Sequence, residues 1–160
     1  MSQEKFSLVE PDDRLTDLFK SADHRTAGLW ARDCALRVLP YFQVHSPEDN
    51  RPQLALNTLQ DWLDSGEFTM RVIRTASLGA HAAARAVGRD NSARSAARSA
   101  GQAVASAHVA AHALAAARYA LQAIDRASRD HDVSPDVNTE REWQRRHLQT
   151  IIDGQPPAET

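Results

Sequence analysis

The chain has 160 residues, of which 42% are hydrophobic and 25% charged, and its formal net charge is −2. This composition is typical of a globular protein and excludes a chain that is disordered throughout, and the length predicts a single core. The near-neutral charge also argues against a dedicated nucleic-acid-binding protein, which normally carries a strong basic excess.

Alanine dominates the middle of the sequence. It occupies 28 positions, and 22 of these lie between Ala76 and Ala127. Alanine is the best helix former, whereas the turn signals and β-branched runs of a β-sandwich or barrel are missing. We therefore predict an all-α fold, a compact bundle of about six helices with an alanine-rich, close-packed centre.

The first half of the chain divides at turn-forming residues. Residues 1–13 are predicted to form a flexible leader and residues 14–20 a short helix. A longer helix is predicted over residues 22–39, where Pro40 should end or kink it. After a turn-rich loop, residues 50–65 form the next predicted helix, which stops at Gly66.

The second half is almost continuously helix-permissive. A helix is predicted from Thr69 to about Val87, with Gly88 after it, and another begins at Asp90 or Asn91. A single straight helix over residues 91–128 would be about 57 Å long and would protrude from a domain of this size, so we predict a break between Gly101 and Ala107.

The last predicted helix begins at Asn138 or Thr139, since Thr139 and Glu142 have the spacing of a capping box. Residues 154–160 are predicted to be a flexible tail, so the expected single helical domain spans residues 14–153. The larger side chains expected to anchor its core are Trp30, Leu36, Phe42, Leu59, Trp62, Leu114, Leu121 and Trp143.

Cys34 is the only cysteine, which excludes an internal disulfide and a thiolate zinc site. It lies on the apolar stripe of its helix, so we expect a small core residue and not a nucleophile. No run of about 18 apolar residues is present, and the first residues do not resemble a signal peptide, so we expect a cytoplasmic protein without a membrane span.

Histidines supply the main candidates for chemistry. His108 and His112 are four residues apart, which on one helix would place them on the same face. A zinc protease also needs glutamate directly after the first histidine, and Val109 stands there. His81 and Arg85 repeat this spacing. Together with Asp33 these residues form a candidate polar cluster: Asp33, His81, Arg85, His108 and His112.

The polar positions within this background resemble a known family. The runs Leu29–Pro40, Gly79–Arg85 and Ala96–Ala113, together with Arg51-Pro52, resemble the Imm-five-like immunity proteins of bacterial polymorphic toxin systems. Gln102 departs from the pattern, because many members are expected to have histidine there. The resemblance implies an all-α domain with a non-enzymatic role, which binds and neutralises a cognate protein toxin. We further expect no cofactor and no metal, and a monomer or homodimer.

The binding face is predicted separately, from charge. Complementary charge speeds the encounter with a basic partner, which makes exposed acidic residues the candidate toxin-binding positions. These are Asp61, Asp64, Glu48 and Asp49.

Two other functions remain open at this stage. One is a small metal-binding or acid–base enzyme that uses the histidines with Asp33. The other is a helical bundle that binds nucleic acid through Arg71, Arg74, Arg94 and Arg98, although the net charge argues against it.

Overall fold

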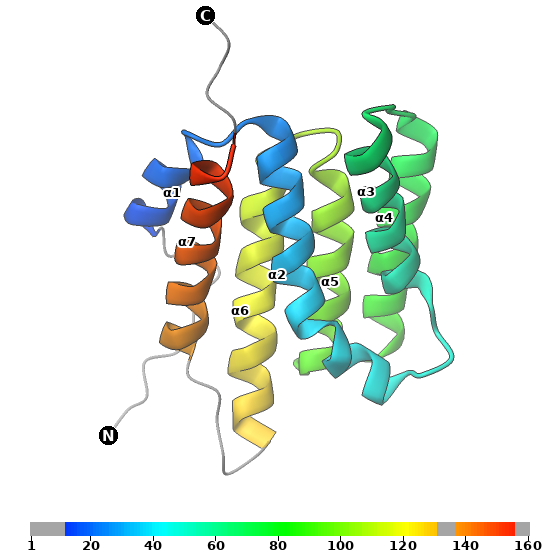
Figure 1. The fold of residues 1–160 in the computed structure, drawn as a ribbon. Helices are drawn as coiled ribbons and strands as arrows, with labels where there is room; N and C mark the ends of the chain where they lie inside the picture. The colour runs from blue at the N-terminus through cyan, green and yellow to red at the C-terminus, as the bar shows by residue number, and fades with distance from the viewer. Residues whose placement is uncertain (1–11, 131–136, 156–160) are drawn as a thin grey trace, which may run out of the picture.

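The structure, a computed structural model, describes residues 12–130 and 137–155 (Figure 1). Over these ranges it is all-helical, without a strand, and its seven helices confirm the predicted fold class. They are α1 (Asp13–Phe19), α2 (His24–His45), α3 (Arg51–Ser65), α4 (Met70–Ala86), α5 (Ser92–Ala105), α6 (His112–Asp130) and α7 (Val137–Asp153).

Helix α5 lies at the centre of the bundle and packs against α2, α3, α4 and α6. Its buried positions carry only small side chains: Ala93, Ser95, Ala96, Ala97, Ser99, Ala100, Gly101, Ala103 and Val104. Such side chains allow neighbouring helix axes to approach closely. The buried Ser99 hydroxyl is satisfied, because it donates a hydrogen bond to the carbonyl of Ala116 on α6 at 2.8 Å. The alanine-rich centre predicted from composition is therefore the contact between α5 and its neighbours.

The predicted break between α5 and α6 is confirmed. Helix α5 ends at Ala105, and residues 106–111 form a turn before α6 begins at His112. His24 secures this turn from the start of α2, since its Nε2–H donates to the carbonyl of Ser106 at 2.6 Å.

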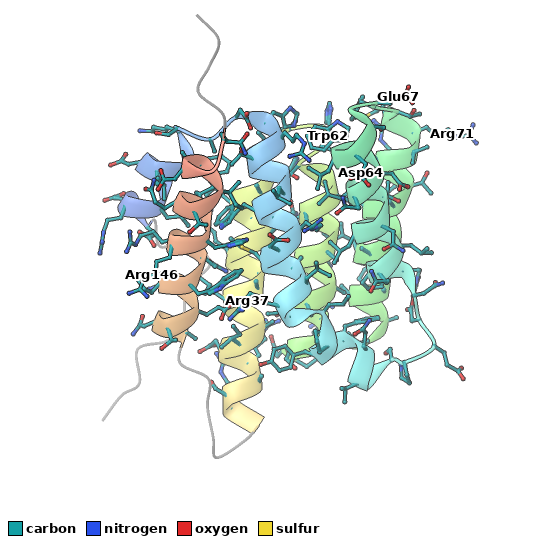
Figure 2. All side chains as sticks on the ribbon, viewed as in Figure 1. Arg37, Trp62, Asp64, Glu67, Arg71 and Arg146 are labelled. Atoms are coloured by element: carbon teal, nitrogen blue, oxygen red, sulfur yellow. The ribbon has the colours of Figure 1, made fainter. Side chains whose placement is uncertain are left out.

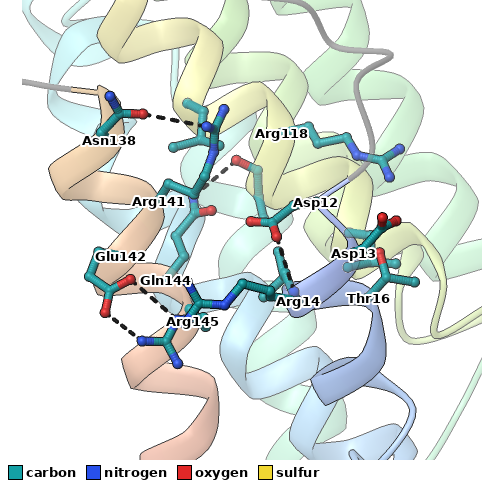
Figure 3. Close-up of a pocket in the computed structure, with 14 residues that line it drawn as sticks. Asp12, Asp13, Arg14, Thr16, Arg118, Asn138, Arg141, Glu142, Gln144 and Arg145 are labelled. Atoms are coloured by element: carbon teal, nitrogen blue, oxygen red, sulfur yellow. Dashed lines mark hydrogen bonds and ion pairs between the residues drawn. The ribbon is translucent and has the colours of Figure 1, made fainter.

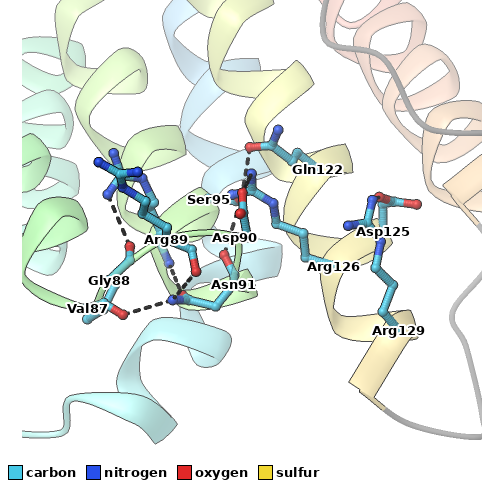
Figure 4. Close-up of polar contacts among 11 residues, drawn as sticks. Val87, Gly88, Arg89, Asp90, Asn91, Ser95, Gln122, Asp125, Arg126 and Arg129 are labelled. Carbon is cyan, nitrogen blue, oxygen red and sulfur yellow. Dashed lines mark hydrogen bonds and ion pairs between the residues drawn. The ribbon is translucent and has the colours of Figure 1, made fainter.

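The turn between α4 and α5 is fixed by side-chain hydrogen bonds (Figure 4). The Asn91 side chain accepts a hydrogen bond from the Arg94 amide at 2.8 Å and donates one to the carbonyl of Val87 at 2.8 Å. Arg126 of α6 then reaches across to Asp90, with nitrogen and oxygen 3.2 Å apart. Asn91, one of the two predicted starting residues, is thus the N-cap of α5.

Pro40 does not end α2, contrary to the prediction, because the helix continues to His45. Proline cannot donate a backbone hydrogen bond to the carbonyl of Leu36. Both residues lie on the exposed side of α2, where water can hydrate that carbonyl. Beyond the proline, Phe42 is fully buried, and this burial favours continuation of the helix.

Two further predictions are wrong in detail. Leu36 is 40% exposed and does not anchor the core, because it lies opposite the buried stripe of α2. Helix α7 begins at Val137, so Thr139 lies inside the helix and is not its N-cap. The carboxylate of Glu142 pairs with Arg145 and Arg146, which takes the place of the predicted capping box.

Several polar contacts attach helix α7 to α2. The indole Nε1 of Trp30 donates to the backbone carbonyl of Gln144 at 2.8 Å, and Arg37 pairs with Glu140, with its Nη2 2.9 Å from a carboxylate oxygen. The same guanidinium lies 3.8 Å from the ring centroid of Trp143.

Candidate functional site

Three of the five residues of the predicted polar cluster meet in one small cavity, which we call the histidine pocket. It has a volume of about 210 Å³ and lies between α4, α5 and the turn of residues 106–111. Its lining residues are Met70, Ile73, Arg74, Ser77, Leu78, His81, Gln102, Ala105, His108 and His112.

His81 projects from α4 onto the backbone of α5. Its Nδ1 accepts a hydrogen bond from Arg98 at 2.8 Å, which assigns the ring proton to Nε2. A Cβ added to Gly101 would lie 2.8 Å from this Nε2, so the glycine is what admits the ring. Burial, followed by the positive charges of Arg98 and Arg85, lowers the pKa of His81 to about 4. His81 is therefore a neutral hydrogen-bond donor at pH 7.

His112 and His108 reach the pocket from two different elements, a helix and a turn. His112 is the first residue of α6, and its Nδ1 donates to the side-chain oxygen of Gln102 at 2.8 Å, which leaves Nε2 as an acceptor. His108 lies in the preceding turn and stacks on Phe68, with ring centroids 5.6 Å apart. The premise that both histidines share one helix face is wrong, because the chain turns between them; the tertiary fold brings them together instead.

The other two members of the predicted cluster lie outside the pocket. Asp33 faces α7, where its carboxylate is 2.7 Å from Nε2 of His147 and 2.7 Å from Arg32. Arg85 is exposed one helical turn beyond His81 and acts on it through charge alone. The titratable side chains that line the pocket are consequently three histidines and one arginine, with no carboxylate among the described lining residues.

This composition bears on the two chemistries that the histidines suggested. Within residues 12–130 and 137–155, no group of three histidine, cysteine, aspartate or glutamate side chains could hold a metal ion. The acid–base alternative paired these histidines with Asp33, and Asp33 is held outside the pocket by His147 and Arg32. Cys34 lies fully buried in the core, and burial raises the pKa of its thiol, which opposes a nucleophilic role.

The four acidic candidates lie on and before α3, in two different environments. Asp49 is half-buried and paired with Arg51 through two hydrogen bonds of 2.9 and 2.7 Å, which lower the pKa of its carboxyl. Glu48, Asp61 and Asp64 are exposed. Asp64 only accepts a hydrogen bond from Gln60 on its own helix.

A larger polar cavity was not predicted from the sequence. It has a volume of about 400 Å³ and lies between α1, α6 and α7, with four arginines among its lining residues: Arg14, Arg118, Arg141 and Arg145 (Figure 3). Its residues come from three helices far apart in the chain, so no local motif could have indicated it.

The comparison with protein families covers the part of the chain in which these sites lie. A family model described as "Imm-5 like putative immunity protein" matches residues 17–151. The chain belongs to this immunity-protein family. The matched range begins within α1 and ends within α7, so it includes both the histidine pocket and the Asp33–His147 pair. Neither a curated protein nor a solved structure matches the chain.

Proposed function

We propose that this protein binds a cognate bacterial toxin and neutralises it by covering a surface that the toxin needs, without chemistry of its own. The observation that carries the proposal is the match of residues 17–151 to an immunity-protein family. The separation of Asp33 from the histidine pocket supports the non-enzymatic part, because the alternative enzyme was predicted to pair these histidines with Asp33.

The proposal also specifies where the protein acts and in which oligomeric state. The protein acts in the bacterial cytoplasm, where the producing cell meets its own polymorphic toxin before release, and it acts as a monomer or homodimer. None of the described helices has the length and hydropathy needed to cross a bilayer.

The test is co-expression with the toxin encoded by the adjacent gene. We expect restored growth and a stable complex on size exclusion. Titration of purified toxin separates binding from catalysis, because a binding inhibitor gives full protection only at equimolar amounts, whereas an enzyme protects at a small fraction of that amount. Absence of both protection and complex would refute the proposal.

The exposed acidic residues of α3 are proposed as part of the toxin-binding face. Asp61→Lys/Asp64→Lys should slow association with a basic toxin surface, because rim charges act mainly on the association rate. Asp17→Lys/Asp153→Lys is the matched control, since these carboxylates are also exposed but lie on α1 and α7. Equal association rates for both double variants would remove Asp61 and Asp64 from the face.

A further inference from the structure

Helix α4 and the turn after it carry arginines that the fold does not use. Arg71, Arg74, Arg85 and Arg89 are exposed, and none of them forms a hydrogen bond or ion pair with another of the residues that the structure describes. Several arginines elsewhere are paired, as Arg37 is with Glu140, although Arg14 and Arg118 form no such pair within the described residues. Between residues 68 and 124 the sequence has seven arginines and one acidic residue, Asp90, and within the described residues none of these four arginines forms an ion pair with a carboxylate.

The position of these arginines at the start of α4 does not favour helix stability. Arg71 is the second residue of α4, at the positive end of the helix macrodipole, and Arg74 follows one turn later, where the effect is weaker. Cations are unfavourable there, and no acidic residue lies in the first turn to offset them. Arginine at these positions is thus better explained by a contact outside the bundle than by the stability of the fold.

Exposed apolar side chains lie among the arginines. At about 100° per residue, Arg71, Arg74, Leu78 and Arg85 fall within about 60° of one another on the outer face of α4. Leu78 is 59% exposed, in the midst of these charges. Figure 2 shows Arg71 pointing away from the bundle at the edge formed by α3 and α4.

The row of Arg71, Arg74, Leu78 and Arg85 on the outer face of α4 forms a ridge, and two depressions lie beside it. On one side the histidine pocket is lined by Arg74 and Leu78. On the other side lies a groove of about 630 Å³ between α3 and α4, where Val72 is 52% and Leu54 is 49% exposed. The groove is lined by Arg51, Leu54, Thr58, Arg71, Val72, Thr75, Ala76 and Gly79. We call the ridge with its two depressions the α4 surface.

We propose that the α4 surface is the docking site for an acidic, amphipathic segment of the cognate toxin. The proposal rests on the proposed function and names the chemistry of the partner. Carboxylates of the segment pair with Arg71, Arg74 and Arg85, and its apolar side chains enter the groove between Leu54 and Val72. Charge complementarity selects the acidic partner, and the apolar groove selects a protein over a nucleic acid, whose phosphates would lie against exposed leucine and valine.

The decisive variant is Arg71→Glu/Arg74→Glu. We expect about tenfold or more weaker toxin binding, because both ion pairs become repulsions. We also expect a melting temperature equal to or above that of the wild type, because glutamate is favourable near a helix N-terminus. The rise in stability distinguishes lost binding from failed folding. Val72→Thr, which keeps the shape of the side chain, should weaken binding severalfold through the groove alone.

The matched control is Arg14→Glu/Arg118→Glu, since these two arginines also have no partner among the described residues but lie at the α1–α6 side of the molecule. Wild-type affinity in this control, with loss in Arg71→Glu/Arg74→Glu, supports the α4 surface. Toxin that binds all variants equally overturns the inference and leaves the proposed function intact.

A second experiment tests the α4 surface without the toxin. A synthetic helical peptide with one leucine face and one glutamate face is titrated into isotope-labelled protein. We expect amide shift changes at Arg71, Val72 and Leu78 that disappear in Arg71→Glu/Arg74→Glu. If the wild type does not bind the toxin, the proposed function fails, and these shifts still support the acidic, amphipathic specificity of the surface. Absence of such shifts, or binding of random-sequence DNA or RNA through the same arginines, overturns the inference.

Discussion

Gly101 on α5 is placed where a side chain would meet the ring of His81. Alanine is favoured over glycine inside a helix by about 1 kcal/mol. For a Gly101→Ala substitution, this gain in helix propensity opposes the steric cost of the added Cβ. The added Cβ would lie 2.8 Å from Nε2 of His81, and moving that ring would break its hydrogen bond to Arg98. We predict that Gly101→Ala lowers the free energy of unfolding by about 1–2 kcal/mol, measured by chemical denaturation.

Gly79 on α4 provides the control for this substitution. The nearest atom to its added Cβ is Cβ of Arg51 at 4.0 Å, which is ordinary contact. Gly79→Ala should therefore raise stability by about 0.5–1 kcal/mol through helix propensity alone. If both variants were equally stable, the close approach of His81 to α5 would be wrong.

His81 also makes stability depend on pH. Its pKa is about 4 in the folded protein against 6.5 for the free side chain, so between these values the unfolded chain binds more protons. Stability must then fall as the pH drops from 6.5 towards 4, and because the ring is partly exposed we expect a loss of about 1–3 kcal/mol from this group.

The variant His81→Gln removes that titration. Its free energy of unfolding should decline less over the same pH interval than that of His45→Gln, which replaces an exposed histidine of α2. Denaturant titrations across the interval measure both slopes, and parallel slopes would contradict the neutral, packed state of His81.

At the scale of elements, α5 tests how closely the helices pack. Ala100 is fully buried at the centre of the bundle, where leucine would need space that the neighbouring helices occupy. We predict that Ala100→Leu costs about 1–3 kcal/mol by overpacking. Ala86→Leu, on an exposed position of α4, should change stability by less than about 0.5 kcal/mol. Similar thermal stability of the two variants would mean that the α5 contacts are loose.

Helix α7 tests the value of a single ion pair. Glu140 is 8% exposed and holds Arg37 against Trp143, so Glu140→Ala leaves a partly buried guanidinium without its counter-charge. We predict a loss of about 1–2 kcal/mol in thermal denaturation. Glu142→Ala, two residues further along the same helix, removes more exposed pairs and should have no measurable effect. Equal losses would show that the Arg37–Glu140 pair contributes no more to stability than the pairs of Glu142.

Helix ends were predictable where a single residue decides them. Gly66 and Gly88 adopt positive φ after α3 and α4, and Asn91 caps α5, all through contacts within a few residues. Pro40 was misjudged for the opposite reason. The preference of proline to end a helix is overridden by the burial of Phe42 against the rest of the bundle. The residues near Pro40 in the sequence do not reveal these distant contacts.

At the scale of the molecule, the candidate site was predictable only as residue types. Sequence indicated that His81, His108 and His112 stand out from an alanine background, and the fold does bring them together. It could not separate them from Asp33, because the partner of Asp33 is His147, 114 positions away. The free arginines of α4 were also missed as a set, since being unpaired is a property of the folded surroundings and not of the sequence.

The central position of α5 predicts the order in which the molecule opens. Helix α5 is surrounded by α2, α3, α4 and α6, whereas α1 contacts the bundle mainly through α7. Amide hydrogen exchange follows local opening, and the most surrounded element exchanges only by global unfolding. We therefore predict, by hydrogen–deuterium exchange with mass spectrometry, the slowest exchange in residues 95–104 and the fastest helical exchange in α1, with α7 between them.

Denaturant added below the unfolding transition sharpens this measurement. If residues 14–153 form one domain, as we propose, exchange in α2 and α6 should converge on that of α5 as denaturant rises. Exchange of α5 as fast as that of α1, or separate unfolding of the α3–α4 pair, would contradict a single core built around α5.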